Sequence, residues 1–195
     1  FQQSPFKTII QPKLEDVQFP DVVLSIFERQ LLQVPVPMVY VFRKPFVHPK
    51  DLCKSLLKLL KHRPEFTGRI VGNLKNASIV PAGMGVPFEF AVHKHSVEPT
   101  YQTLLNLLKA HTDTGSLINT FHENFPLLKV NMIECLNVVV LLVRTPHGIS
   151  DAKSVFTLLE QWAQIHRNLS PDFGEGQDAD TTTEKDTPNR LQDVA

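Results

Sequence analysis

Three segments of the chain repeat their apolar residues at the spacing of a helix with one buried face. Residues 48–63 place leucines on one side and lysines on the other, and Pro49 suits the first helical turn while Pro64 ends the helix. Residues 152–167 show the strongest pattern of this kind, and residues 101–110 show a shorter one. We therefore predict helices over these three ranges.

Strand patterns lie between the predicted helices. Residues 34–42 are rich in β-branched and aromatic residues, but Pro35 and Pro37 assign the start of this strand to a sheet edge or an irregular entry. Residues 137–145 are almost continuously apolar, which is typical of a strand covered on both faces. Further strands are predicted at residues 66–71, 77–80, 88–95 and 127–134. This order of elements favours an α+β or α/β fold, in which helices flank a mixed sheet.

The last part of the chain differs in composition from the rest. Residues 170–195 contain few large apolar side chains and an excess of acidic ones, so we predict a disordered acidic tail. Residues 1–169 then form one domain with enough apolar residues to bury a core. Near the start of this domain, residues 22–27 are expected to form an amphipathic stretch after polar residues.

Charge, cysteine content and hydropathy narrow the functional classes. Lysine plus arginine equals aspartate plus glutamate, at 20 each, which argues against a nucleic-acid-binding protein. Cys53 and Cys135 each lie in an apolar run and show no metal-binding spacing, so a reducing, cytoplasmic location is expected. No apolar run approaches the ~18 residues of a membrane span, and no signal-peptide pattern opens the chain.

Other polar residues within the predicted strands have less specific interpretations. His93 and His95 share the polar face of one strand, but no third ligand accompanies them at a suitable spacing. Solvent-facing or cross-strand roles are therefore favoured over a metal site. A buried carboxylate is a candidate partner for Arg69.

The loop after the buried strand contains the main candidates for chemistry, His147 and Asp151. A rigid strand and a helix on either side fix the position of such a loop. An imidazole can take a proton from a hydroxyl or amine that attacks a carbonyl, and a nearby carboxylate can orient the ring or hold the loop. The pattern by itself is short, so the alternative is a surface loop whose aspartate caps the next helix.

The surroundings of this loop resemble the BAHD family of acyl-CoA-dependent acyltransferases, which carry an HxxxDG motif at the end of a buried strand. Residues 147–152 (HGISDA) follow such a strand and precede a helix with a late tryptophan, Trp162. Residues 36–42 look like the family's first core strand, and residues 66–70 (FTGRI) resemble its LAGRL element. Residues 83–88 (GMGVPF) resemble its N-x-x-G-V-x-F turn, and all of these elements occur in the family's order.

Three departures from the family pattern stand out. Ala152 replaces the usual glycine. Pro146 stands where peptide-synthetase condensation domains and chloramphenicol acetyltransferases tend to have a second histidine, which favours the BAHD-like branch. The resemblance also covers the N-terminal half of the family alone, without the half that supplies most of the CoA channel.

The resemblance implies one half of a chloramphenicol-acetyltransferase-like fold. It implies transfer of an acyl group from acyl-CoA, as co-substrate, to an alcohol or amine, with no bound cofactor or metal. His147 would be the general base, Asp151 would hold the loop, and Val36 and Met38 would line the substrate channel. The partner would be a second acyltransferase half or another copy, because a lone half leaves apolar surface uncovered near His147. The alternative function is a non-catalytic fragment or binding module that retains this half of the fold.

Overall fold

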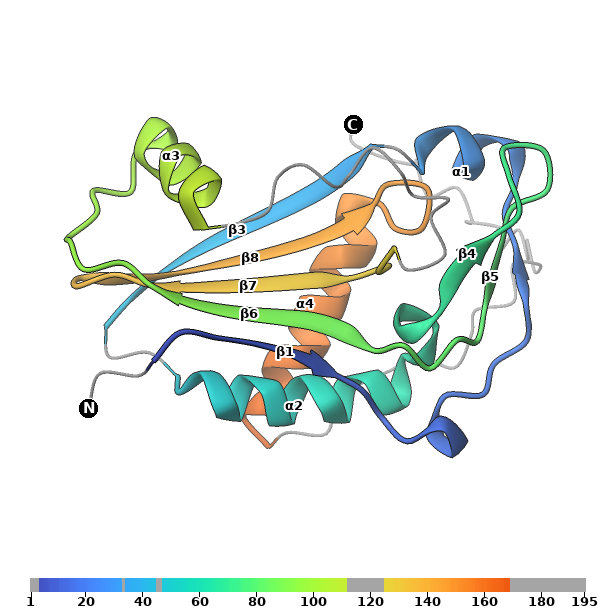
Figure 1. Ribbon diagram of the computed structural model, residues 1–195, viewed down its shortest axis with the longest axis horizontal. Helices are drawn as coiled ribbons and strands as arrows, with labels where there is room; N and C mark the ends of the chain where they lie inside the picture. The colour runs from blue at the N-terminus through green and yellow to red at the C-terminus, as the bar shows by residue number, and fades with distance from the viewer. Residues whose placement is uncertain (1–3, 33, 45–46, 112–124, 169–195) are drawn as a thin grey trace, which may run out of the picture.

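A five-stranded mixed sheet forms the centre of the molecule (Figure 1). The computed structural model describes residues 4–32, 34–44, 47–111 and 125–168. In spatial order the strands are β1 (Phe6–Ile10), β6 (Val86–Val92), β7 (Lys129–Glu134), β8 (Val138–Pro146) and β3 (Pro35–Arg43). β6 and β7 are parallel and the other neighbours are antiparallel, so the predicted mixed sheet is confirmed.

Helices cover both faces of this sheet, one of them more completely. α2 (Pro49–His62) and α4 (Ala152–His166) pack against the same face and enclose the main core with it (Figure 1). α3 (Tyr101–His111) contacts the other face through Leu107, which packs with Val138 and Val140. The mixed α+β class and the three predicted helices are therefore confirmed. α2 and α4 bury the apolar stripes that their sequences show, and α3 buries Leu107 of its stripe.

A second, smaller sheet lies beyond the end of the main one. Its strands are β2 (Val22–Val23), β5 (Ser78–Val80) and β4 (Arg69–Val71), in that spatial order. Two short 3₁₀ helices, η1 (Leu14–Asp16) and η2 (Pro64–Thr67), and a six-residue helix, α1 (Ile26–Leu31), complete the described elements. The core of this unit includes Leu127 and Ile149, so the small sheet is joined to the loop that follows β8.

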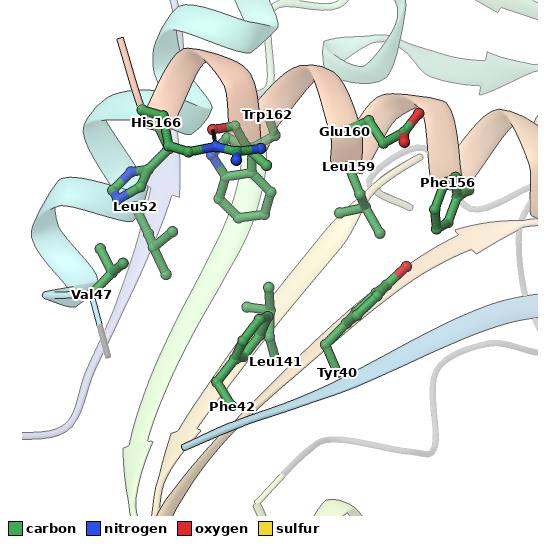
Figure 2. Close-up of a pocket in the computed structure, with 12 residues that line it drawn as sticks. Tyr40, Phe42, Val47, Leu52, Leu141, Phe156, Leu159, Glu160, Trp162 and His166 are labelled. Carbon is green, nitrogen blue, oxygen red and sulfur yellow. Dashed lines mark hydrogen bonds between the residues drawn. The ribbon is translucent and has the colours of Figure 1, made fainter. Parts of the chain in front are cut away.

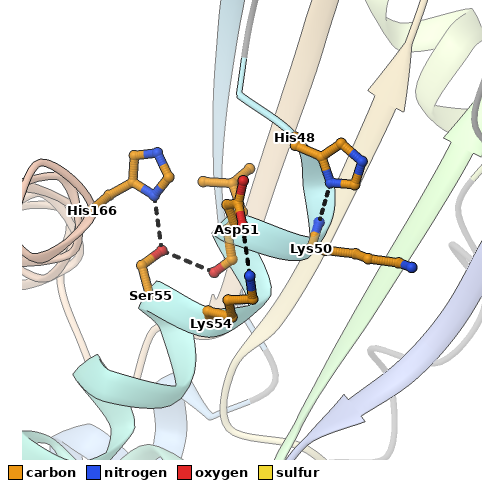
Figure 3. Close-up of polar contacts among 7 residues, drawn as sticks. His48, Lys50, Asp51, Lys54, Ser55 and His166 are labelled. Carbon is orange, nitrogen blue, oxygen red and sulfur yellow. Dashed lines mark hydrogen bonds and ion pairs between the residues drawn. The ribbon is translucent and has the colours of Figure 1, made fainter. Parts of the chain in front are cut away.

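A buried serine connects α2 and α4. Ser55 Oγ accepts a hydrogen bond from Trp162 Nε1 at 2.8 Å. It also lies 3.1 Å from His166 Nδ1 and 3.0 Å from the carbonyl of Leu52 (Figure 3). The hydroxyl has one proton, so it donates either to this carbonyl or to the imidazole. At the start of α2, the side chain of His48 caps the helix by accepting a hydrogen bond from the Lys50 amide. The Ser55 contacts fix how the two covering helices pack.

Several predictions from the sequence need correction. Residues 66–71 do not form one strand: η2 continues to Thr67 and β4 begins at Arg69. Residues 22–27 do not form one amphipathic element, since β2 ends at Val23 and α1 begins at Ile26. The N-terminal edge strand, β1, was not predicted. The predicted tail, residues 170–195, lies outside the described residues.

The structure also gives the hydrogen-bond partners of two polar residues discussed above, Arg69 and His93. Arg69 donates hydrogen bonds to the carbonyls of Thr67, Gly68 and Gly85, and no carboxylate of the described residues forms an ion pair with it, contrary to the suggested partner. Burial lowers the pKa of Arg69 to about 10. β6 ends at Val92, and His93 beyond it places Nδ1 3.1 Å from Nε2 of His111. Among the described residues, no group of three or more ligand-type side chains could hold a metal ion.

Candidate active site

The candidate loop follows β8, which is the most buried of the described strands. All nine residues of β8 are buried, and the strand pairs with β3 on one side and β7 on the other. The predicted apolar strand is thereby confirmed. Because the strand is held on both sides and both faces, the loop that follows it starts from a fixed point.

Backbone hydrogen bonds hold the loop in a tight turn. The amide of His147 donates to the carbonyl of Val34 at 2.6 Å, which extends the β3–β8 pairing by one residue. The amides of Ile149 and Ser150 both donate to the carbonyl of Pro146, at 3.0 and 3.3 Å. The buried hydroxyls of Thr145 and Ser150 lie 3.1 Å apart and join the two ends of the turn. The amides of His147, Ile149 and Ser150 are therefore all hydrogen-bonded within or beside the turn.

Gly148 packs directly against helix α1. A Cβ atom at this position would lie 1.9 Å from the carbonyl oxygen of Glu28, so only glycine allows this contact. α1 begins with a capping box, in which Ser25 and Glu28 each accept from the other's amide. It exposes Ile26 and Phe27, 59% and 73% exposed, close to the loop. This agrees with the expectation of uncovered apolar surface near His147.

The side chain of His147 is half-buried in this loop. Its Nδ1 atom is enclosed and makes no hydrogen bond with any of the described residues. An enclosed ring nitrogen without a hydrogen-bond partner costs free energy. Such a half-buried imidazole at the end of a rigid strand is placed as a proton-transfer group would be.

Asp151 has a separate task at the start of α4. It is the N-cap of this helix, and its carboxylate accepts a hydrogen bond from the Ser154 amide at 2.7 Å. Hydrogen bonds from the Ser154 backbone and side chain hold the pKa of Asp151 below its usual value, with smaller contributions from the charges of His147 and Lys153. The carboxylate is exposed, and the described residue that it bonds is Ser154 rather than His147. The capping alternative is therefore correct as a structural description.

Val36 and Met38 lie on β3, beside the strand that carries the loop. Both are partly buried and pack against the main core on the face covered by α2 and α4. Their place in a substrate channel stays a prediction.

A pocket beside the loop, with charged residues in a largely apolar lining, was not predicted from the sequence. It has a volume of about 240 Å³, and its lining includes Thr145 and Pro146 together with Glu89, Lys129 and Arg144. Arg144 lies three residues before His147, which is about 10 Å along an extended strand. No local pattern reveals this pocket, because it is formed by the alignment of three strands distant in sequence.

A chain of hydrogen bonds crosses those strands. Arg144 donates to the Asn131 side chain at 3.1 Å, and Asn131 donates to Glu89 at 2.7 Å. Glu89 forms ion pairs with Lys129 at 3.0 Å and Lys7 at 3.4 Å. Burial acts to raise the pKa of Glu89, but the hydrogen bond and charge of Lys129, with those of Lys7, outweigh it and hold the pKa below its usual value. The site therefore presents ionised groups of both signs close to the loop.

Solved structures share this fold. Vinorine synthase aligns with a TM-score of 0.66 and 20% identity, over 87% of this chain and 44% of that one. TRI101 of F. sporotrichioides, solved with coenzyme A and T-2, gives a TM-score of 0.60 and 18% identity, over 77% and 42%. The starter condensation domain of rhizomide synthetase RzmA gives 0.55 and 9%, over 79% and 40%. The chain thus spans less than half the length of these proteins, as expected for one half of the fold.

Sequence comparisons and the described helices add three findings. No curated protein sequence matches the chain significantly. Within the described part of the chain, no helix is both long and apolar enough to cross a membrane. The family model named Transferase family matches residues 5–183. Because this match covers most of the sequence, the chain belongs to the Transferase family of BAHD acyltransferases.

Proposed function

We propose that this chain contributes the N-terminal half of an acyltransferase that moves an acyl group from acyl-CoA to an alcohol or amine. The observation that carries the proposal is the half-buried imidazole of His147, whose enclosed Nδ1 has no partner among the described residues, at the end of a fully buried strand. Membership of the BAHD family and the coenzyme A in the TRI101 structure support it.

In this mechanism His147 removes the proton from the acceptor hydroxyl or amine. The acceptor then attacks the thioester carbonyl, the bond between the acyl carbon and sulfur breaks, and the CoA sulfur takes the proton from the His147 imidazolium and leaves as the thiol. Asp151 acts through the helix start: it keeps the turn in place and contributes a negative charge that favours the transient imidazolium. Val36 and Met38 would line the channel of the assembled enzyme.

The second part of the proposal concerns what completes the site. The chain covers 42–44% of TRI101 and vinorine synthase, so we expect a second acyltransferase half, in a longer protein or as a partner, to supply the rest of the CoA channel. The free thiols of Cys53 and Cys135 suit a cytoplasmic location. The second candidate function is a non-catalytic fragment or binding module that retains this half of the fold.

The test measures consumption of acetyl-CoA by chromatography, with a panel of alcohols and amines as acceptors. It uses the chain alone and in the longest natural protein that contains it. His147→Ala should lower the rate by about 10²–10⁴-fold. The matched control is His95→Ala, an exposed histidine beyond the opposite end of the sheet, which should keep the wild-type rate. Full turnover by His147→Ala would contradict the assignment of the base, and CoA binding without turnover in every form would favour the binding module.

A further inference from the structure

Two histidines outside the candidate loop contact each other on the side of the main sheet that α3 covers. His93 follows β6, and its Nδ1 atom lies 3.1 Å from Nε2 of His111, the last residue of α3. The two rings meet edge to face, with an interplanar angle of 85°. His166 differs, because it lies on the opposite side of the sheet, where it lines an apolar groove between α4 and β3 (Figure 2). The contact of His93 with His111 therefore joins the end of a helix to the sheet through two imidazoles.

The two ends of α3 are held by different kinds of group. The segment that leads into the helix is fixed by Asn137, whose side chain accepts a hydrogen bond from the amide of Val97 at 2.8 Å and donates one to its carbonyl at 2.9 Å. This carboxamide does not titrate. The other end is held by the contact of His111 with His93, which does involve titratable groups. α3 thus has a start that is fixed at any pH and an end whose contact depends on protons.

The apolar contact between these two ends is small. Leu107 is the one residue of α3 that is buried, and Leu104 and Leu108 are partly buried against the same cluster, which includes Val138 and Val140 of β8. A helix that buries so little apolar surface opens locally at a modest free energy. A single polar contact can therefore decide whether its end stays docked.

The contact between the two rings requires a nitrogen that carries no proton. A neutral imidazole has one N–H and one unprotonated nitrogen, so a facing nitrogen of one ring can accept a hydrogen bond from the other ring. When both rings are charged, both facing nitrogens carry N–H groups, and two positively charged rings face each other with nitrogens 3.1 Å apart. The missing acceptor and the repulsion both oppose the docked position.

The charged groups around the pair do not offset this repulsion. In the described part of the chain, the basic side chains on the surrounding segments are Lys44, Lys94, His95 and Lys109. The acidic ones are Glu98, which is exposed, and Glu134, which forms an ion pair with Lys44 at 2.6 Å. The thiol of Cys135 stays neutral, because burial raises its pKa. The surroundings are therefore more basic than acidic.

The position of His111 makes its protonation unfavourable in the docked helix. Burial, and after it the charge of His93, lowers the pKa of His111 from its ordinary value of 6.5. The docked helix therefore binds this proton more weakly than a released helix, so docking is strong at neutral pH and weakens as the pH falls below 6.5. We propose that the contact between His93 and His111 is a pH-dependent clamp, which releases the end of α3 from the sheet when both rings become charged. Release exposes the apolar cluster beneath α3 and leaves the main core, on the other side of the sheet, intact.

The test measures how fast Cys135 reacts with dithiodipyridine, an aromatic disulfide that labels thiols in neutral and mildly acidic solution. Cys135 is 1% exposed and belongs to the cluster beneath α3, so its labelling reports the release of the helix. Cys53, on α2, is the internal reference, and the ratio of the two rates removes the shared dependence of thiolate formation on pH. Peptide mass spectrometry separates the two sites, and EDTA keeps metal ions away from the imidazoles.

The ratio of Cys135 to Cys53 labelling should rise about tenfold or more in the wild type between about pH 7.5 and about pH 5.5. His93→Gln and His111→Gln each remove one of the two charges, so the rise should be absent from both single variants. The matched control is His62→Gln, an exposed histidine at the end of α2, which should show the wild-type rise.

Three results would overturn the proposal. An equal labelling ratio at both pH values would show that α3 stays docked when the rings are charged. An undiminished rise in His93→Gln and His111→Gln would assign the pH dependence to other groups. A rise that accompanies a shift in the emission of Trp162, which is bonded to α2 in the main core, would show that the whole domain loosens rather than α3 alone. None of these outcomes depends on acyl transfer.

Discussion

Replacement of Gly148 by alanine tests the contact between the candidate loop and helix α1. The added Cβ would lie 1.9 Å from the carbonyl oxygen of Glu28, whereas ordinary van der Waals contact begins at 3.4 Å, so one of the two segments must move by about 1.5 Å. The obstacle is backbone, which cannot rotate away as a side chain can. Overpacking of this kind costs about 1–3 kcal/mol, and we expect a loss of unfolding free energy within that range.

The assay combines urea unfolding with limited trypsin digestion. α1 contains Arg29, so displacement of this helix from the loop should speed cleavage there while the rest of the domain stays resistant. The denaturation midpoint should fall with little change in the slope of the transition, because the surface exposed on unfolding is nearly the same. His147→Ala, which shortens the neighbouring side chain, serves as the control without a clash. If Gly148→Ala matches the wild type in midpoint and cleavage rate, α1 does not rest on the loop.

Two further predictions concern the helices that hold the loop and the core. Asp151→Ala should lower the melting temperature near neutral pH, because it removes the cap of α4. The pKa of Asp151 is lowered in the folded state. The difference in melting temperature from the wild type should therefore be present above the ordinary pKa of 3.8 and disappear as the pH falls through the folded-state pKa. Equal melting curves at all pH values would show that the cap contributes nothing. Ser55→Ala should cost about 1–3 kcal/mol of unfolding free energy, because the buried Trp162 N–H loses its acceptor, and should shift the emission of this sole tryptophan. Unchanged emission with unchanged stability would contradict the hydrogen bond, and Ser55→Thr, which keeps the hydroxyl, is the matched control.

The parts of the fold that the sequence predicted are those whose pattern is set by burial along a single element. α2 and α4 each bury one stripe and expose the other side, and β8 is apolar throughout because both its faces are covered. The N-terminal edge strand β1 was missed because its burial is incomplete: Lys7 and Ile9 are exposed and only Ile10 is fully buried. The start of β4 was placed too early because Thr67 closes a 3₁₀ turn onto the carbonyl of Pro64. Short-range hydrogen bonds of this kind leave no periodic signal.

The candidate site likewise contains residues that the sequence could identify and contacts that it could not. His147 and Asp151 could be named because they are close in sequence and sit between two strongly patterned elements. The contact of Gly148 with α1 and the chain of bonds from Arg144 through Asn131 to Glu89 could not, because they depend on strand register and on segments distant in sequence. A single sequence does not specify which strands are neighbours in the sheet.

The contrast between β8 and α1 has a consequence for how the loop fluctuates. Backbone amides in a strand that is paired on both sides exchange with solvent only in rare, nearly global openings, whereas a short surface helix opens locally at little cost. All of β8 is buried, and no residue within α1 is. α1 can therefore detach and reattach many times during the lifetime of the folded sheet. Hydrogen exchange should report slow amides up to Thr145 and fast ones from Ile26 to Leu31, so that access to His147 changes without melting the strand that positions it.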